Sequence, residues 1–146
     1  MTQRLDPETA SPEASKAMAA LDGYVETCGL DHSLLDLVKT RASQINGCAF
    51  CVHLHTGEAR ARGEREERLY LLDVWWESPL YSERERAALA WTDAVTLVSE
   101  SRVPDAVYDE ARRHFSEEEM VKLTVAIGLI NAWNRIGVGF RMAHPV

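Results

Sequence analysis

The chain has 146 residues, a length typical of one domain that buries a hydrophobic core without disulfide or metal staples. Hydrophobic residues make up 46% and charged residues 27%, which argues against disorder. We see no run of about 18 uncharged apolar residues that would span a membrane. The net charge of −7, with arginines scattered among glutamates, argues against nucleic-acid binding.

Helix signals follow one another along the chain and predict an all-α protein of about seven helices. Ser11-Pro12 is typical of a helix start after a polar arm, and Asn46-Gly47 is typical of a helix end. The expected helices cover approximately residues 11–29, 31–46, 48–62 and 64–75, a long segment from 82, then 104–114 and 116–140.

Two of these starts are capping-box patterns, Ser82 with Glu85 and Ser116 with Glu119. No segment alternates with a period of two, and no repeat or long linker divides the chain. We therefore expect an N-terminal arm at residues 1–12 and one helical domain at residues 13–146. The arm lacks the apolar run of a secretory signal, so a cytoplasmic protein is expected.

The residues with chemical potential lie at the predicted start of the third helix. Cys48 and Cys51 are three residues apart, so on a helix they lie one turn apart and can bridge. His55 follows Cys51 by four residues and shares its face, which places a base beside a nucleophile. A helix start and a Cys-x-x-Cys setting both favour a thiolate.

Other readings of this segment remain open. A zinc site is disfavoured because His53 and His55 point about 200° apart around a helix. Val52 stands where haem attachment needs a histidine, whereas a purely structural cysteine pair stays possible. Cys28 is expected to be a small buried side chain. The charged run at residues 58–68 is interpreted as a solvated face, and the four tryptophans as core or interface residues.

Three segments together resemble the AhpD-like alkylhydroperoxidase branch of the carboxymuconolactone decarboxylase family. They read DLVKTRASQINGCAFCVHLHTG at residues 36–57, ERERAALAWTDAV at 83–95 and INAWNRIGVGFR at 130–141. The resemblance implies an all-helical fold, peroxidase or thiol–disulfide chemistry, and assembly into trimers or hexamers. Decarboxylases of the wider family lack the cysteine pair, which argues against decarboxylation here.

By this resemblance Cys51 attacks the peroxide, Cys48 resolves the oxidised sulfur and His55 belongs to a proton relay. Asp36 stands where the family usually has a glutamate, so the relay is expected to need an extra water or to be weakened. Phe50 replaces a histidine that some active peroxidases carry between the cysteines. The expected activity is dithiol-dependent reduction of hydroperoxides, with no bound cofactor and no metal.

Two further functions remain open at this stage. The same pair can act as a protein disulfide exchanger or redox sensor, or the chain can be a helical interaction module with incidental thiols. The segment from Leu123 to Phe140 is apolar on more faces than one monomer easily covers, and it carries small residues such as Gly137. A homo-oligomer is therefore expected, with another copy of the chain packed against these small residues.

Overall fold

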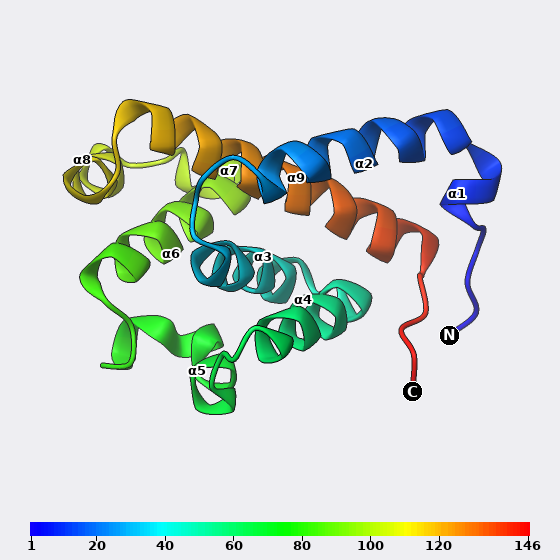
Figure 1. Ribbon diagram of the computed structural model, residues 1–146, viewed down its shortest axis with the longest axis horizontal. Coiled ribbons are helices and arrows are strands. Elements are labelled where there is room, and N and C mark those ends of the chain that lie inside the picture. The colour runs from blue at the N-terminus through cyan, green and yellow to red at the C-terminus, as the bar shows by residue number, and fades with distance from the viewer.

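The computed structural model describes residues 1–146 and contains helices and no strands, which confirms the predicted all-α class (Figure 1). It has ten helical segments, so the prediction of about seven was too low. Two short helices were missed, α1 (Pro7–Ala10) in the polar arm and α7 (Val98–Ser101). The fourth predicted helix is divided into α5 (Glu66–Tyr70) and the 3-10 helix η1 (Leu72–Glu77).

The remaining helices begin and end close to the positions that their capping residues predict. Their bounds are α2 Pro12–Glu26, α3 His32–Asn46, α4 Ala49–Ala61, α6 Glu83–Thr96, α8 Asp105–His114 and α9 Glu117–Phe140. Both capping boxes are formed, at Ser82 before α6 and at Ser116 before α9. Gly47 ends α3 with a φ of 66°, a left-handed conformation that suits glycine. This turn brings α4 back against α3.

Helix α3 occupies the centre of the molecule, between α4, α6 and α9 (Figure 1). Ten consecutive residues of α3, from Leu34 to Ser43, are buried, so every side of this helix meets protein. A large apolar cluster joins α3 to α6 and α9. A smaller cluster, formed by Ala42, Cys48, Cys51 and Ile130, lies where α3, α4 and α9 meet. The cysteine pair is thus part of the packed interior.

Helix α9 has the length and apolar character to cross a membrane, which the sequence analysis did not anticipate. In this structure it is a core helix, because Leu123, Ile127 and Ile130 are buried within the molecule. Val121 and Val138 stay exposed on its outer side. The expectation that Gly137 receives a helix of another copy was wrong, because this glycine packs on the cysteines of its own chain.

The first 26 residues form a thin layer, α1 and α2, over one end of α9. Val25 is the only buried residue of α2. Polar bonds hold this layer: the Trp133 indole N–H donates to Asp22 Oδ2 at 2.8 Å, and Arg4 Nη1 donates to the Gly139 carbonyl at 2.9 Å. The two chain termini consequently lie on the same side of the molecule (Figure 1). We call α1 and α2 the roof, because they cover the cavity described next.

Candidate active site

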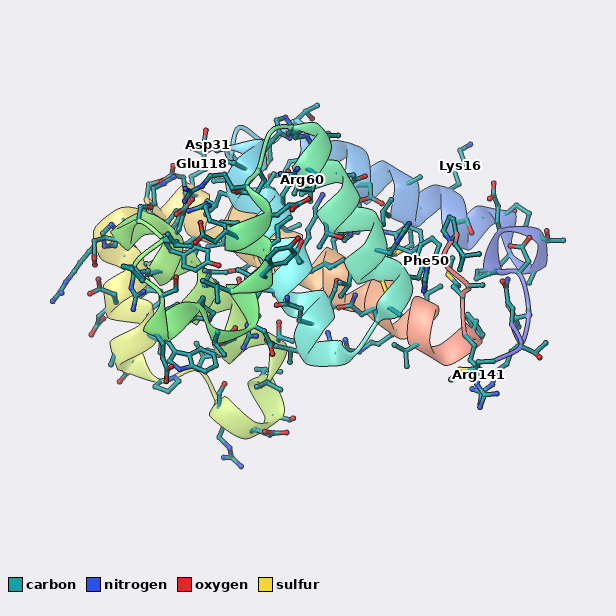
Figure 2. The ribbon with its side chains drawn as sticks, turned by 90° about the horizontal axis from the view of Figure 1, so that it is seen from below. Lys16, Asp31, Phe50, Arg60, Glu118 and Arg141 are labelled. Carbon is teal, nitrogen blue, oxygen red and sulfur yellow. A yellow bond between two sulfur atoms is a disulfide. The ribbon has the colours of Figure 1, made fainter.

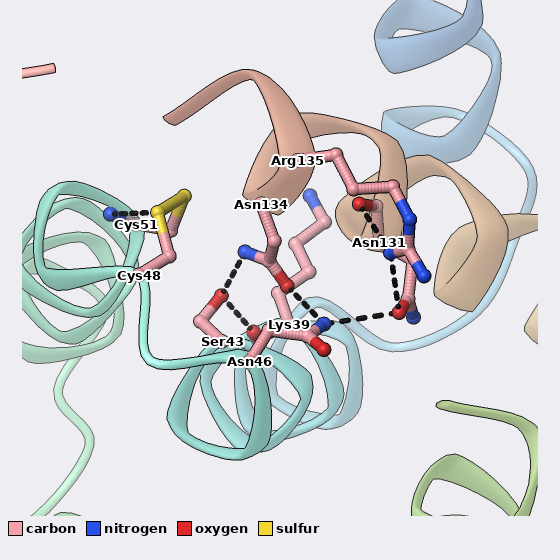
Figure 3. The surroundings of a disulfide bond; sticks show 8 residues. All are labelled: Lys39, Ser43, Asn46, Cys48, Cys51, Asn131, Asn134 and Arg135. Carbon is pink, nitrogen blue, oxygen red and sulfur yellow. Dashed lines mark hydrogen bonds between the residues drawn. A yellow bond between two sulfur atoms is a disulfide. The ribbon is translucent and has the colours of Figure 1, made fainter. Parts of the chain in front are cut away.

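Cys48 and Cys51 form a disulfide at the start of α4, as their spacing predicted (Figure 3). Their Cα atoms are 5.3 Å apart, within the range that a disulfide allows. Cys48 is the N-cap residue of α4, and the Cys51 backbone N–H donates to Cys48 Sγ at 3.3 Å. The helix start therefore directs a backbone donor at Cys48, so a thiolate there gains a charge-assisted hydrogen bond.

Helix α9 covers the disulfide closely. A Cβ atom added at Gly137 would lie 2.7 Å from Cys48 Sγ, so only glycine permits this approach. Beside it, the Asn46 amide donates to Asn134 Oδ1 and the Asn134 amide donates to Ser43 Oγ, each at 2.9 Å (Figure 3). These bonds fix the end of α3 to α9, which holds the two cysteines in one position.

The two sulfur atoms differ in their access to a cavity of about 770 Å³. Cys51 lines this cavity together with Phe50, Leu54 and Trp133, whereas Cys48 does not. Phe50 and Lys16, both labelled in Figure 2, mark the α4 side and the roof side of this region. The volume suits a small organic molecule. A compound that enters the cavity therefore meets Cys51 first.

His55 lies on the Cys51 face of α4 and lines the same cavity. It is only 8% exposed, and burial lowers its pKa below the usual value because the charged ring would lose its hydration. A hydrogen bond between His55 Nδ1 and Glu58 Oε2, 3.0 Å long, opposes that effect. His53 points to the other side, as expected, where it is exposed and stacks on His144.

Asp36 is buried beside Arg62 rather than bonded to His55. Arg62 Nη1 donates to Asp36 Oδ1 at 2.5 Å and Arg62 Nη2 donates to Glu26 at 3.1 Å. Burial raises the pKa of Asp36, and the Arg62 hydrogen bond acts in the opposite direction. Its second oxygen, Oδ2, is buried without a hydrogen-bond partner. The structure thus brings Cys51 and His55 to one cavity but leaves the link from His55 to Asp36 indirect.

The interpretation of residues 58–68 as a solvated face was wrong at Glu64 and Arg68, which form an i, i+4 ion pair but are mostly buried. Glu58 and Arg62 are partly exposed, and they also line the cavity. The spacing of three residues between His55 and Glu58 is a helical-neighbour signal that was available in the sequence. No such signal relates Arg62 to Asp36, which are 26 residues apart. Cys28 is buried and free, as expected.

Residues 12–94 match the carboxymuconolactone decarboxylase family. The chain belongs to this family. The chain is similar to two uncharacterised proteins. YdfG of Bacillus subtilis is 41% identical over 94% of both chains. YnjA of Escherichia coli is 33% identical over 70% of this chain and 56% of its own length.

Solved structures support the AhpD-like assignment within the carboxymuconolactone decarboxylase family. ATU0492 of Agrobacterium tumefaciens is 54% identical over 99% of both chains, with a TM-score of 0.98. It is a protein of unknown function that has been suggested to be the antioxidant defence protein AhpD. The debrominase Bmp8 shares the fold, with a TM-score of 0.84 at 21% identity over 92% of this chain and 73% of its own. The cysteine pair thus belongs to an AhpD-like fold.

Proposed function

We propose that this protein is a thiol-dependent peroxidase that reduces hydroperoxides through Cys48 and Cys51, with His55 as a proton relay. The observation that carries the proposal is the position of Cys51, which joins a disulfide on one side and a cavity with a buried histidine on the other. The kinship with ATU0492 supports an antioxidant role. We also propose that the protein is cytoplasmic and that its site needs no bound cofactor.

The proposed cycle begins with the reduced pair. The Cys51 thiolate attacks the outer oxygen of the hydroperoxide, the O–O bond breaks, and the departing alkoxide takes a proton to become an alcohol. Cys51 is left as a sulfenic acid. The Cys48 thiol then attacks this sulfur, water leaves, and the disulfide forms. An external dithiol returns two electrons and two protons, which restores both thiols.

His55 is suited to carry the proton through this cycle. Because burial favours its neutral form, the ring can accept the Cys51 proton and return it to the alkoxide. The hydrogen bond to Glu58 orients the His55 ring and stabilises its charged form while the ring holds the proton. A positioned acid contributes about 10² to 10⁴-fold, whereas lowering a thiol pKa also weakens the nucleophile. Proton transfer is therefore the larger contribution that this site makes.

Asp36 is proposed to support the relay through its charge. Its carboxylate raises the pKa of His55 by electrostatic attraction, although Arg62 accounts for its hydrogen bond. The shorter side chain, compared with the usual glutamate, is consistent with the missing direct contact to the histidine. A relay that includes Asp36 then needs an intervening water between the two groups.

The protein is further proposed to act as a trimer or hexamer. Exposed apolar side chains on two helices support association, namely Leu21 and Tyr24 of α2 and Val121 and Val138 of α9. A contact through α2 would place a second copy next to the roof. The partners of the protein are then its hydroperoxide substrate, a separate dithiol reductant and further copies of the chain.

The deciding experiment measures hydroperoxide consumption with a panel of dithiol donors. Turnover should be lost in Cys51→Ser and retained in Cys28→Ser, the matched control, because Cys28 is a free buried thiol outside the cavity. Lack of peroxide consumption with every donor would overturn the proposal. If protein disulfides are exchanged under those conditions, the pair instead serves a disulfide exchanger or redox sensor.

A further inference from the structure

Lys39 is a largely buried lysine whose ammonium group has no hydrogen-bonding partner. It lies on α3, is 7% exposed, and lines the cavity together with Cys51 and His55. Its side chain extends from α3 toward α9 (Figure 3). No ion pair or hydrogen bond of the structure involves its ammonium group. Its Nζ atom is not fully buried, so the ammonium reaches the cavity, where an anion can pair with it.

None of the other charged groups around the cavity forms an ion pair with Lys39. They are Asp6 and Glu8 at the start of α1, Lys16, Asp22 and Glu26 of α2, Glu58 of α4, and Arg62, the C-cap residue of α4. The inner carboxylates are already engaged: Asp22 accepts from Trp133, Glu26 from Arg62, and Glu58 bonds His55. Asp36, one turn before Lys39 on α3, bonds Arg62 through Oδ1 and attracts the Lys39 ammonium, but it forms no ion pair or hydrogen bond with it. Helix α9 contributes Trp133 and no charge to the lining.

Reduction of the disulfide supplies a new anion at this place. A dithiol donor gives two electrons to the Cys48–Cys51 bond and becomes a disulfide itself. In the proposed cycle Cys51 is the thiolate and Cys48 the thiol, although the helix start also offers Cys48 a backbone hydrogen bond. Of the two sulfur atoms, only Cys51 lines the cavity that Lys39 also lines.

The remaining cations near Cys51 are less suited to pair with this thiolate. Arg62 is held by two carboxylates, and Lys16 is exposed on the roof. His55 carries the Cys51 proton during the proposed cycle, but burial disfavours its charged form. We propose that Lys39 is the counter-charge of the Cys51 thiolate in the reduced protein. Lys39 is thus a positioning residue that stabilises the reduced state and makes the disulfide easier to reduce. The inference rests on Cys51 as the reactive sulfur of the proposed function.

The test uses the reduced protein with one thiol, in a Cys28→Ser, Cys48→Ser background, and iodoacetamide as the probe. The alkylation rate is measured against pH, because only the thiolate reacts. Removal of an opposite charge at close range raises a thiol pKa, so Lys39→Met should move the midpoint upward by about one pH unit or more. Lys39→Arg should restore most of this shift. Lys122→Met, which removes an equal charge from α9 outside the cavity, should leave the midpoint in place.

A second readout uses the wild-type cysteine pair in dithiothreitol buffers. Lys39→Met should need about tenfold more reducing conditions, the equivalent of one unit in the thiol pKa. Lys39→Gln serves as another neutral variant if the methionine variant does not fold. An unmoved alkylation midpoint in a folded neutral variant would overturn the proposal. The alkylation assay uses iodoacetamide and no peroxide, so it does not depend on peroxidase activity. A shifted midpoint in a protein without peroxide turnover would contradict the proposed peroxidase function but still support Lys39 as the counter-charge of Cys51.

Discussion

Replacing Gly137 with alanine tests how closely α9 packs against the disulfide. The added Cβ atom would lie 2.7 Å from Cys48 Sγ and 3.4 Å from Cys51 Sγ. The first distance is shorter than the contacts that real Cβ atoms make, so either α9 or the Cys48 side chain must move. Overpacking of this kind costs about 1–3 kcal/mol.

The same helix offers two controls that separate this clash from helix propensity. Gly128 and Gly139 are also on α9, and a Cβ atom added at either position meets no atom within 4 Å. Alanine there should stabilise the helix by up to about 1 kcal/mol. Gly137→Ala should therefore have an unfolding free energy about 1–3 kcal/mol below that of Gly128→Ala, which lowers the melting temperature by several degrees.

A redox titration adds a second measurement on the same variants. The Cys48 side chain can rotate away from the new methyl group only after reduction, so the clash destabilises the disulfide more than the dithiol. Each kcal/mol of that difference shifts the reduction equilibrium about fivefold toward the dithiol. The reasoning fails if oxidised Gly137→Ala is as stable as Gly128→Ala and both are reduced at the same dithiothreitol concentration.

Four other outcomes are expected. After treatment with mild peroxide, mass spectra of Cys48→Ser should show sulfenic acid at Cys51. If sulfenic acid forms at Cys48 of Cys51→Ser instead, Cys48 is the attacking sulfur and Cys51 the resolving one. His55→Ala should lower peroxide turnover by about 10²-fold or more, and Glu58→Gln should lower it by less. A loss of only severalfold in His55→Ala would exclude His55 as the proton donor. Burial lowers the pKa of His55, so just below pH 6.5 the unfolded chain binds more protons than the folded protein. The wild-type stability to urea should therefore decrease as the pH is lowered below 6.5, and His55→Gln should make this decrease smaller. Asp36→Glu should raise turnover if the longer side chain restores the relay, whereas an unchanged rate would remove Asp36 from it.

Light scattering tests the proposed assembly. The wild-type mass should be three or six times 16.4 kDa. Charges introduced at Val121 and Val138 should reduce it, because these apolar side chains are exposed on a single chain. A stable monomer at micromolar concentration would contradict this proposal.

Local signals in the sequence predicted the elements of this fold well. Ser82 and Ser116 satisfy backbone donors within their own helix starts, so a few neighbouring residues determine where α6 and α9 begin. The fourth predicted helix failed because α5 already ends at Tyr70 and the 3-10 helix η1, with non-helical backbone angles at Val74, follows it. Its apolar spacing still suits a helix, so nothing in the local sequence indicates that tertiary packing divides this segment.

The candidate site shows the same limit. Spacing along one helix placed Cys48, Cys51 and His55 together, because these positions share a helical face. The partnership of Asp36 with Arg62 depends on how α3 packs against α4, and the burial of Lys39 depends on the roof and α9 as well. Such relations require the packing angle between helices, which hydrophobic periodicity does not contain.

The bond from Arg4 to the Gly139 carbonyl joins residues that are 135 positions apart. During synthesis the roof therefore cannot close before α9 has been made and has left the ribosome. Until α9 emerges, Gly137 cannot cover Cys48, and both thiols of the nascent chain are open to oxidants and alkylating agents. The two thiols are thus most exposed to oxidation before the chain has folded completely. A chain truncated before α9 would keep them exposed.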